Sequence, residues 1–153
     1  MPFPLLALAP IALAVVLPAR ASDLAISDAW VRALPPTQPT TAAYLTVHNR
    51  GPQAVTITGA SAEGAGQVEI HTTREVDGLM RMTPLSTLEV PAGGSVELAP
   101  GGTHLMLLEL ERMPGPGETR ELCLLAGEAP AICVDAEVRK DSGGDTAHDH
   151  HHH

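Results

Sequence analysis

The chain has 153 residues, of which 44% are hydrophobic, which is enough for one domain with a hydrophobic core and makes a second domain unexpected. Its formal net charge of −9 is spread along the chain and argues against nucleic acid and anionic membrane surfaces as partners. The charge is expected to attract cations in general, and it selects no particular metal.

The first residues, MPFPLLALAPIALAVVLPARAS, form an apolar run that ends in Ala19-Arg20-Ala21. This small-x-small ending is typical of a signal-peptide cleavage site, and we expect cleavage after Ala21. The alternative is a retained anchor, but the prolines in the run argue against a lasting membrane helix. Residues 1–21 are therefore predicted to be a signal peptide, with the mature chain in the periplasm and no membrane insertion after cleavage.

Short apolar runs follow one another between residues 22 and 140, bounded by Gly and Pro at spacings of about eight to twelve residues. Val, Ile, Leu and Thr dominate these runs, and no window sustains a helical period of 3.6 residues. We therefore predict one all-β domain over residues 22–140, built as a two-sheet sandwich or a Greek-key barrel. The predicted strands lie within residues 42–49, 54–60, 67–73, 95–100, 104–111, 120–126 and 132–139.

Two cysteines, Cys123 and Cys133, flank the segment 127–129. A three-residue turn there pairs residue 126 with residue 130, and hence Cys123 with Cys133, so that the two thiols face each other. In an oxidising compartment this arrangement predicts a cross-strand disulfide, worth about 2–3 kcal/mol for so short a loop. The alternative is a redox pair or a thiolate metal site, for which the sequence offers neither a C-x-x-C spacing nor a nearby third ligand.

Histidine and methionine residues gather at the ends of these runs. His71 ends one run, and Met80 and Met82 alternate in GLMRM, so that they share a face. His104 and Met106 share a face of another strand for the same reason. Two imidazoles with two thioethers form a donor set that suits Cu(I) and binds Zn(II), Ca(II) or Mg(II) poorly. Ordinary packing is the alternative, because Met fills gaps in cores and a single His on an apolar face is usually a core residue.

Three further residues of these types have plainer interpretations. Met80 is expected to pack in the core or to support the ligands. Met113, beside Pro114, is expected at the surface or in a loop, and His48 is expected to cap a turn or to face solvent.

The spacing of four of these residues resembles the signature of the PCu(A)C-type periplasmic copper chaperones, His-x10-Met-x21-His-x-Met. His71, Met82, His104 and Met106 match all four positions. Residues 24 to 140 are similar to the family in other stretches too, among them ISDAWVRALPP, AAYLTVHNRG, GLMRMTPL and GGTHLMLLEL. One difference is that residues 72 and 73 are both Thr, where family members often carry a further Met.

This resemblance implies a cupredoxin-like Greek-key β-sandwich that binds Cu(I) through the four matching residues. It also implies that the protein delivers Cu(I) towards the copper centres of a cytochrome c oxidase subunit, alongside a Sco-type partner with a thioredoxin fold. A copper buffer or detoxification protein without a dedicated acceptor remains open.

An electron-transfer cupredoxin would need a Cys thiolate ligand, and both cysteines lie away from the His and Met positions. No catalytic motif is present, so enzymatic activity is not predicted.

The last segment, DSGGDTAHDHHHH from residue 141 to residue 153, has Ala147 as its one apolar residue and is predicted to be a disordered tail. Imidazole suits Cu(II) better than Cu(I), which makes the tail a candidate accessory site that captures Cu(II). Asp149 interrupts its histidines, unlike a usual purification tag of six in a row, although both a native and a tag origin remain open. The candidate accessory ligands are His148, His150, His151, His152 and His153.

Overall fold

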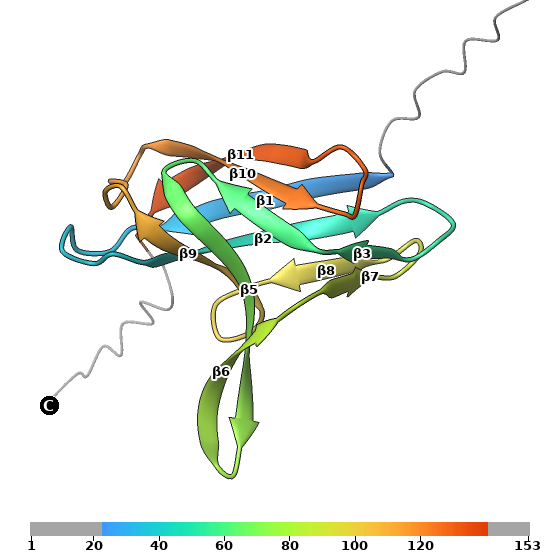
Figure 1. Cartoon of the computed structure of the whole chain (residues 1–153), viewed down its shortest axis with the longest axis horizontal. Coiled ribbons are helices and arrows are strands. Elements are labelled where there is room, and N and C mark those ends of the chain that lie inside the picture. The colour runs from blue at the N-terminus through green and yellow to red at the C-terminus, as the bar shows by residue number, and fades with distance from the viewer. Residues whose placement is uncertain (1–22, 141–153) are drawn as a thin grey trace, which may run out of the picture.

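The computed structural model describes residues 23–140, which form eleven strands and no helix (Figure 1). The all-β prediction is therefore confirmed for this part of the chain. The predicted signal peptide and the His-rich tail lie outside the described residues. Within the described part, no helix is long and apolar enough to cross a membrane. The strands are β1 (Leu24–Arg32), β2 (Thr41–Asn49), β3 (Val55–Ile57), β4 (Gly59–Ala62), β5 (Ala65–Val76), β6 (Leu79–Leu85), β7 (Leu88–Val90), β8 (Ser95–Leu98), β9 (His104–Leu110), β10 (Thr119–Leu125) and β11 (Ile132–Arg139).

Most strands belong to one sheet, in the order β4-β10-β11-β1-β2-β9-β5-β6, with β8 also paired to β2. Only β1 and β11 run parallel; the other pairs are antiparallel. A second, small sheet pairs β3 with β7. β4 and β5 lie near opposite ends of the main order but are joined by a turn at Glu63 and Gly64. The sheet must therefore curl back on itself, which gives the barrel-like body in Figure 1.

Alternation along the strands gives the body its core. Leu105 and Leu107 on β9, Leu45 on β2 and Leu122 on β10 are at most 1% exposed and pack in one cluster. Their neighbours along each strand point to the opposite, outer face of the sheet. The core therefore holds the strands in place while the outer face remains available for polar and metal-binding side chains.

Several strands differ from the sequence prediction. The run 54–60 divides into β3 and β4, and β1, β6 and β7 lie outside the predicted strand ranges. β1 escapes the simple alternating pattern because it contains a bulge, with a register shift between Ser27 and Trp30 and a φ of 54° at Asp28. Asp is one of the few non-glycine residues that tolerate this left-handed conformation. β7 has only three residues, too few to show a period.

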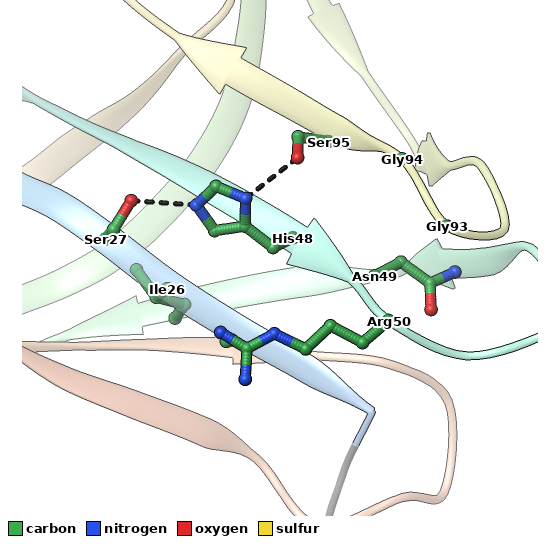
Figure 2. Close-up of a pocket in the computed structure, with 9 residues that line it drawn as sticks. Ile26, Ser27, His48, Asn49, Arg50, Gly93, Gly94 and Ser95 are labelled. Atoms are coloured by element: carbon green, nitrogen blue, oxygen red, sulfur yellow. Dashed lines mark hydrogen bonds between the residues drawn. The ribbon is translucent and has the colours of Figure 1, made fainter.

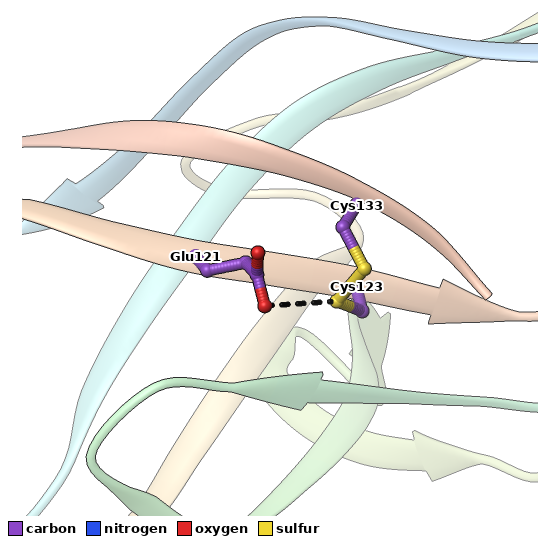
Figure 3. Close-up of side chains that lie close together, drawn as sticks. All are labelled: Glu121, Cys123 and Cys133. Carbon is purple, nitrogen blue, oxygen red and sulfur yellow. Dashed lines mark hydrogen bonds between the residues drawn. A yellow bond between two sulfur atoms is a disulfide. The ribbon is translucent and has the colours of Figure 1, made fainter.

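β10 and β11 form a hairpin in which Cys123 lies opposite Cys133, and a disulfide joins the two (Figure 3). The connection is longer than the predicted three-residue turn, because β10 ends at Leu125 and β11 begins at Ile132.

Glu121 lies beside the disulfide, with its Oε1 3.7 Å from Sγ of Cys123. These three residues present their potential ligand atoms within 4.8 Å of one another. Because the sulfurs are bonded to each other, they offer no thiolate, and the group is not a metal site in this state.

Candidate metal centre

The four predicted ligands project from three neighbouring strands, β9, β5 and β6. His71 on β5 lies opposite His104 on β9. Met82 on β6 lies opposite Thr73, which is two residues after His71. Directly opposed residues share a face of an antiparallel sheet, as do residues at positions i and i+2. The register therefore places both histidines, Met82 and Met106 on the same outer face.

A chain of hydrogen bonds orients the His71 ring. Nε2 of His71 lies 2.7 Å from Oε2 of Glu69, and the amide of Gln67 donates to the other oxygen of Glu69, also at 2.7 Å. Since an ionised carboxylate only accepts hydrogen bonds, Nε2 carries the proton, and in the neutral ring Nδ1 carries the lone pair. Nδ1 is buried and has no hydrogen-bond partner among the described residues. A buried nitrogen lone pair without a partner is costly, and a metal ion would satisfy it.

A hydrogen bond also orients the His104 ring, but through Nδ1 instead of Nε2. Its Nδ1 lies 3.0 Å from the carbonyl oxygen of Gly102, which can only accept, so Nδ1 carries the proton and Nε2 carries the lone pair. The same carbonyl accepts a hydrogen bond from the backbone N–H of Thr73 at 3.3 Å, which ties the loop before β9 to β5. Gly101 gives this loop its turn through a φ of 81°, in the region that favours glycine.

The spacing of the two rings is compatible with a single shared ion. The ring centroids of His71 and His104 are 5.9 Å apart. An imidazole nitrogen binds a metal such as zinc at about 2.0–2.1 Å, and its ring centroid lies about 1.1 Å further out, so two rings on one ion have centroids no more than about 6.5 Å apart. The observed spacing lies within this limit, as a shared ion requires.

The two thioethers differ from the histidines in exposure. His104 is only 4% exposed, whereas Met82 is 52% exposed, and Met106 lies between these extremes. A hollow of about 210 Å³ is lined by Met82, His104 and Met106, together with Tyr44 and Arg32. An incoming ion, or the ligand of another protein, can therefore reach these donors from solvent.

A row of rings crosses the outer face next to the hollow. The centroids of Trp30 and Tyr44 are 4.5 Å apart, and those of Tyr44 and His104 are 6.3 Å apart. Trp30 and Tyr44 are buried with Ala42 in a small cluster separate from the main core. The chain has one Trp and one Tyr. Tyr44 lies beside His104 on its β2 side, and Trp30 packs against Tyr44. Sequence reasoning missed them and Glu69, although the polar alternation in QVEIH marks Glu69 as a neighbour of His71 on the same face.

His48 lies apart from this group, at another hollow of about 310 Å³ (Figure 2). Its Nε2 and Nδ1 each lie 2.8 Å from a serine hydroxyl, those of Ser27 and Ser95 respectively. Ser27 donates its own proton to Asp28, so it accepts from Nε2–H of His48, and Ser95 then donates to Nδ1. Both ring nitrogens are occupied, so His48 joins β1, β2 and β8 rather than capping a turn.

The structure also places the other two methionines of the described residues. Met80 is 64% exposed, so the packing role predicted for it is wrong. Met113 follows β9 in a loop, as expected, but it is buried at 9% exposure rather than lying at the surface. The candidate tail ligands lie outside the described residues.

Comparison with known proteins shows the family to which the chain belongs. The family described as "LpqE-like: Putative lipoprotein LpqE-like" matches residues 24–138. "Putative lipoprotein Lxx21020" of Leifsonia xyli subsp. xyli (strain CTCB07) is 31% identical over 125 residues, which cover 81% of this chain and 74% of the relative.

Several solved structures are similar to this chain in fold. The solution structure of apo-DR1885 from Deinococcus radiodurans is 31% identical, with a TM-score of 0.62, over 94% of this chain and 99% of that one. The structure of its CuI form is also 31% identical, with a TM-score of 0.57, over 84% and 83% of the two chains. The apo PCuAC domain of PmoF1 is 22% identical, with a TM-score of 0.65, over 80% and 98%, which shows the fold alone.

The hydrogen bonds of the two rings predict which nitrogens are available to a metal. In the metal-free protein, long-range proton–nitrogen NMR correlations should show His71 protonated at Nε2 and His104 protonated at Nδ1 in their neutral forms. Glu69→Ala should remove the preference at His71 and leave His104 unchanged, because Gly102 is unaffected. The opposite tautomer at either ring in the unsubstituted protein would contradict the assignment.

Proposed function

The chain belongs to the LpqE-like family and has the cupredoxin-like fold of PCuAC domains, and from this premise we propose that it is a periplasmic copper chaperone that binds one Cu(I) ion. The resemblance to PCu(A)C-type proteins predicted from the sequence is thereby confirmed as a matter of family. The proposed ligand atoms are Nδ1 of His71, Nε2 of His104 and the sulfurs of Met82 and Met106.

The observation that carries this proposal is the pairing of two nitrogen lone pairs on one face with two thioethers. His71 contributes a buried Nδ1 without a partner, and His104 opposite it is held with its Nε2 available. Neutral imidazole and thioether donors together suit Cu(I), whereas hard cations prefer oxygen ligands. The CuI form of DR1885, a relative at 31% identity, supports copper as the ion.

The exposure of the donors favours a carrier over a storage cage. The histidines are embedded in the sheet, while Met82 stands half in solvent beside an open hollow. Neutral thioethers exchange without proton transfer, because they have no proton to lose on binding. A partner's ligands can therefore replace those of the chaperone one at a time, without release of the ion into water.

The acceptors we propose are the copper centres of cytochrome c oxidase, reached alongside a Sco-type protein. The alternative is a copper buffer or detoxification protein without a dedicated acceptor. Deletion of the gene should impair oxidase assembly at limiting copper, with rescue by added copper. Copper sensitivity with normal oxidase assembly would support the buffer and contradict delivery.

Substitution of the sulfur ligands tests the site itself. Met82→Leu and Met106→Leu should each weaken Cu(I) binding at least about tenfold, because they remove one donor and preserve apolar volume. Met113→Leu is the matched control, since it removes a buried thioether that lines a different hollow, beside Pro114 and Pro116. Affinity is measured anaerobically by competition with a Cu(I) chelator, and thermal unfolding checks that each variant is folded. Unchanged affinity in Met106→Leu and in His71→Ala would exclude the proposed ligand set.

We also propose that the tail, residues 141–153, is an accessory Cu(II) site. Its imidazoles suit Cu(II), and a short tether can keep captured copper near the Cu(I) site at an effective concentration of about a millimolar. Removal of the tail should abolish tight Cu(II) binding and leave Cu(I) affinity unchanged, as measured by separate titrations of the two ions. Equal Cu(II) affinity in the truncated and full chains would show that the tail has no such role.

A further inference from the structure

The β5–β6 hairpin extends well beyond the body of the protein (Figure 1). The pairing of β5 with β9 ends where His71 meets His104, whereas its pairing with β6 continues to Val76 and Leu79. Residues 72–83 therefore form a two-stranded ribbon, which begins at the candidate metal centre. A ribbon of two strands gains little from its own packing, because neither face has a sheet or helix to cover it.

The exposed apolar side chains of the described residues concentrate on this ribbon. Six large apolar side chains are exposed in residues 23–140, and four of them belong to the ribbon: Val76, Leu79, Met80 and Met82. Exposed apolar groups gathered in one place mark a surface that contacts another molecule. The ribbon therefore has the properties of a contact surface, and the proposed copper ligand Met82 is part of it.

The register separates the two faces of the ribbon. Met82 lies opposite Thr73 and Met80 lies opposite Glu75, so both thioethers share the face that leads to His71. Leu79 points to the other face, because side chains alternate along a strand. Met80 and Met82 are two residues apart, which separates their Cα atoms by about 7 Å. Methionine is long, unbranched and flexible, so the two sulfurs can meet at one ion.

The exposure of Met80 excludes a packing role. At 64%, it is the most exposed of the large apolar side chains in the described residues. It lies further along the ribbon than Met82, on the same face, and therefore further from the buried histidines. A soft sulfur donor thus stands between the candidate site and the far end of the ribbon.

We propose that Met80 is a transfer ligand, which binds Cu(I) while the ion enters or leaves and does not bind it in the resting complex. This inference rests on the proposed function. On departure a Cu–S bond to Met80 forms while the bond to Met106, on the more distant strand β9, breaks. Copper remains Cu(I) throughout, and no proton moves, since neither thioether carries one. Met80 and Met82, with the imidazoles of His71 and His104 still bound, then present the ion at the exposed ribbon. Each bond from a ligand of the acceptor protein forms as one bond from these four donors breaks.

The test measures the affinity for Cu(I) and the rate of Cu(I) transfer separately. Met80→Leu keeps the volume and apolar character of the side chain and removes its sulfur, and Leu79→Ala is the matched control on the opposite face, where Leu79 is 60% exposed. Equilibrium affinity is measured by competition with bicinchoninate. The rate of Cu(I) transfer from the loaded protein to excess bicinchoninate is followed anaerobically by stopped-flow absorbance.

Met80→Leu should leave Cu(I) affinity within about threefold of the unsubstituted protein and slow transfer about tenfold. Leu79→Ala should change neither quantity. An unchanged transfer rate in Met80→Leu would overturn the inference and leave the proposed function intact. A loss of affinity as large as that in Met82→Leu would overturn it too, because Met80 would then be a resident ligand. Failure of the unsubstituted protein to bind Cu(I) would overturn the proposed function and this inference together.

NMR of protein labelled at the methionine methyl carbons gives an independent readout. In the complex with one equivalent of Cu(I), the methyl signals of Met82 and Met106 should shift while that of Met80 stays near its metal-free position. Addition of half an equivalent of bicinchoninate should broaden the Met80 signal as the ion exchanges. A Met80 signal that stays sharp during exchange, or that shifts with Met82 in the resting complex, would contradict transient binding.

Discussion

The pairing of β5 with β9, in which His71 lies directly opposite His104, is the constraint on which the candidate site depends. Ile70 and Leu105, the pair next to the histidines, are at most 4% exposed and point into the core. A slip of one residue would expose Ile70 to water and turn His71 into the core, at a large cost in burial. Hydrophobic packing on one face of the sheet therefore determines the position of the metal-binding side chains on the other.

The same arrangement gives the four donors different degrees of support and exposure. Hydrogen bonds to Glu69 and Gly102 orient the two imidazoles, and the buried ring of Tyr44 stands next to His104. Met82 is more exposed, at 52%, on a ribbon in which β6 pairs with β5 alone. Oriented nitrogen donors can keep an ion in place, and an exposed sulfur donor gives an incoming ligand access to it. This combination suits reversible binding better than a cage of four buried ligands.

The sequence was sufficient to predict the all-β class, because alternation is a local property of a strand. The candidate ligand set rests on the resemblance to a family signature, and it stays a prediction. The sequence was not sufficient to predict β1, whose bulge at Asp28 interrupts the alternation. The position of Tyr44 beside His104 depends on the pairing of strands far apart in the chain, which no local pattern records. Met80 was misjudged for a related reason: β6 pairs with β5 alone over residues 79–83, so its apolar side chains have no core to enter.

X-ray absorption spectroscopy of the anaerobic complex with one equivalent of Cu(I) tests most directly whether imidazole and thioether donors share one ion. The ligand set predicts a Cu(I) edge with two nitrogen scatterers at about 2.0 Å and two sulfur scatterers at about 2.3 Å, by analogy with metal–ligand distances in zinc sites. Met82→Leu should reduce the sulfur contribution by half and leave the nitrogen contribution unchanged. A first shell of nitrogen and oxygen alone in the unsubstituted protein would contradict the assignment of Met82 and Met106 as ligands.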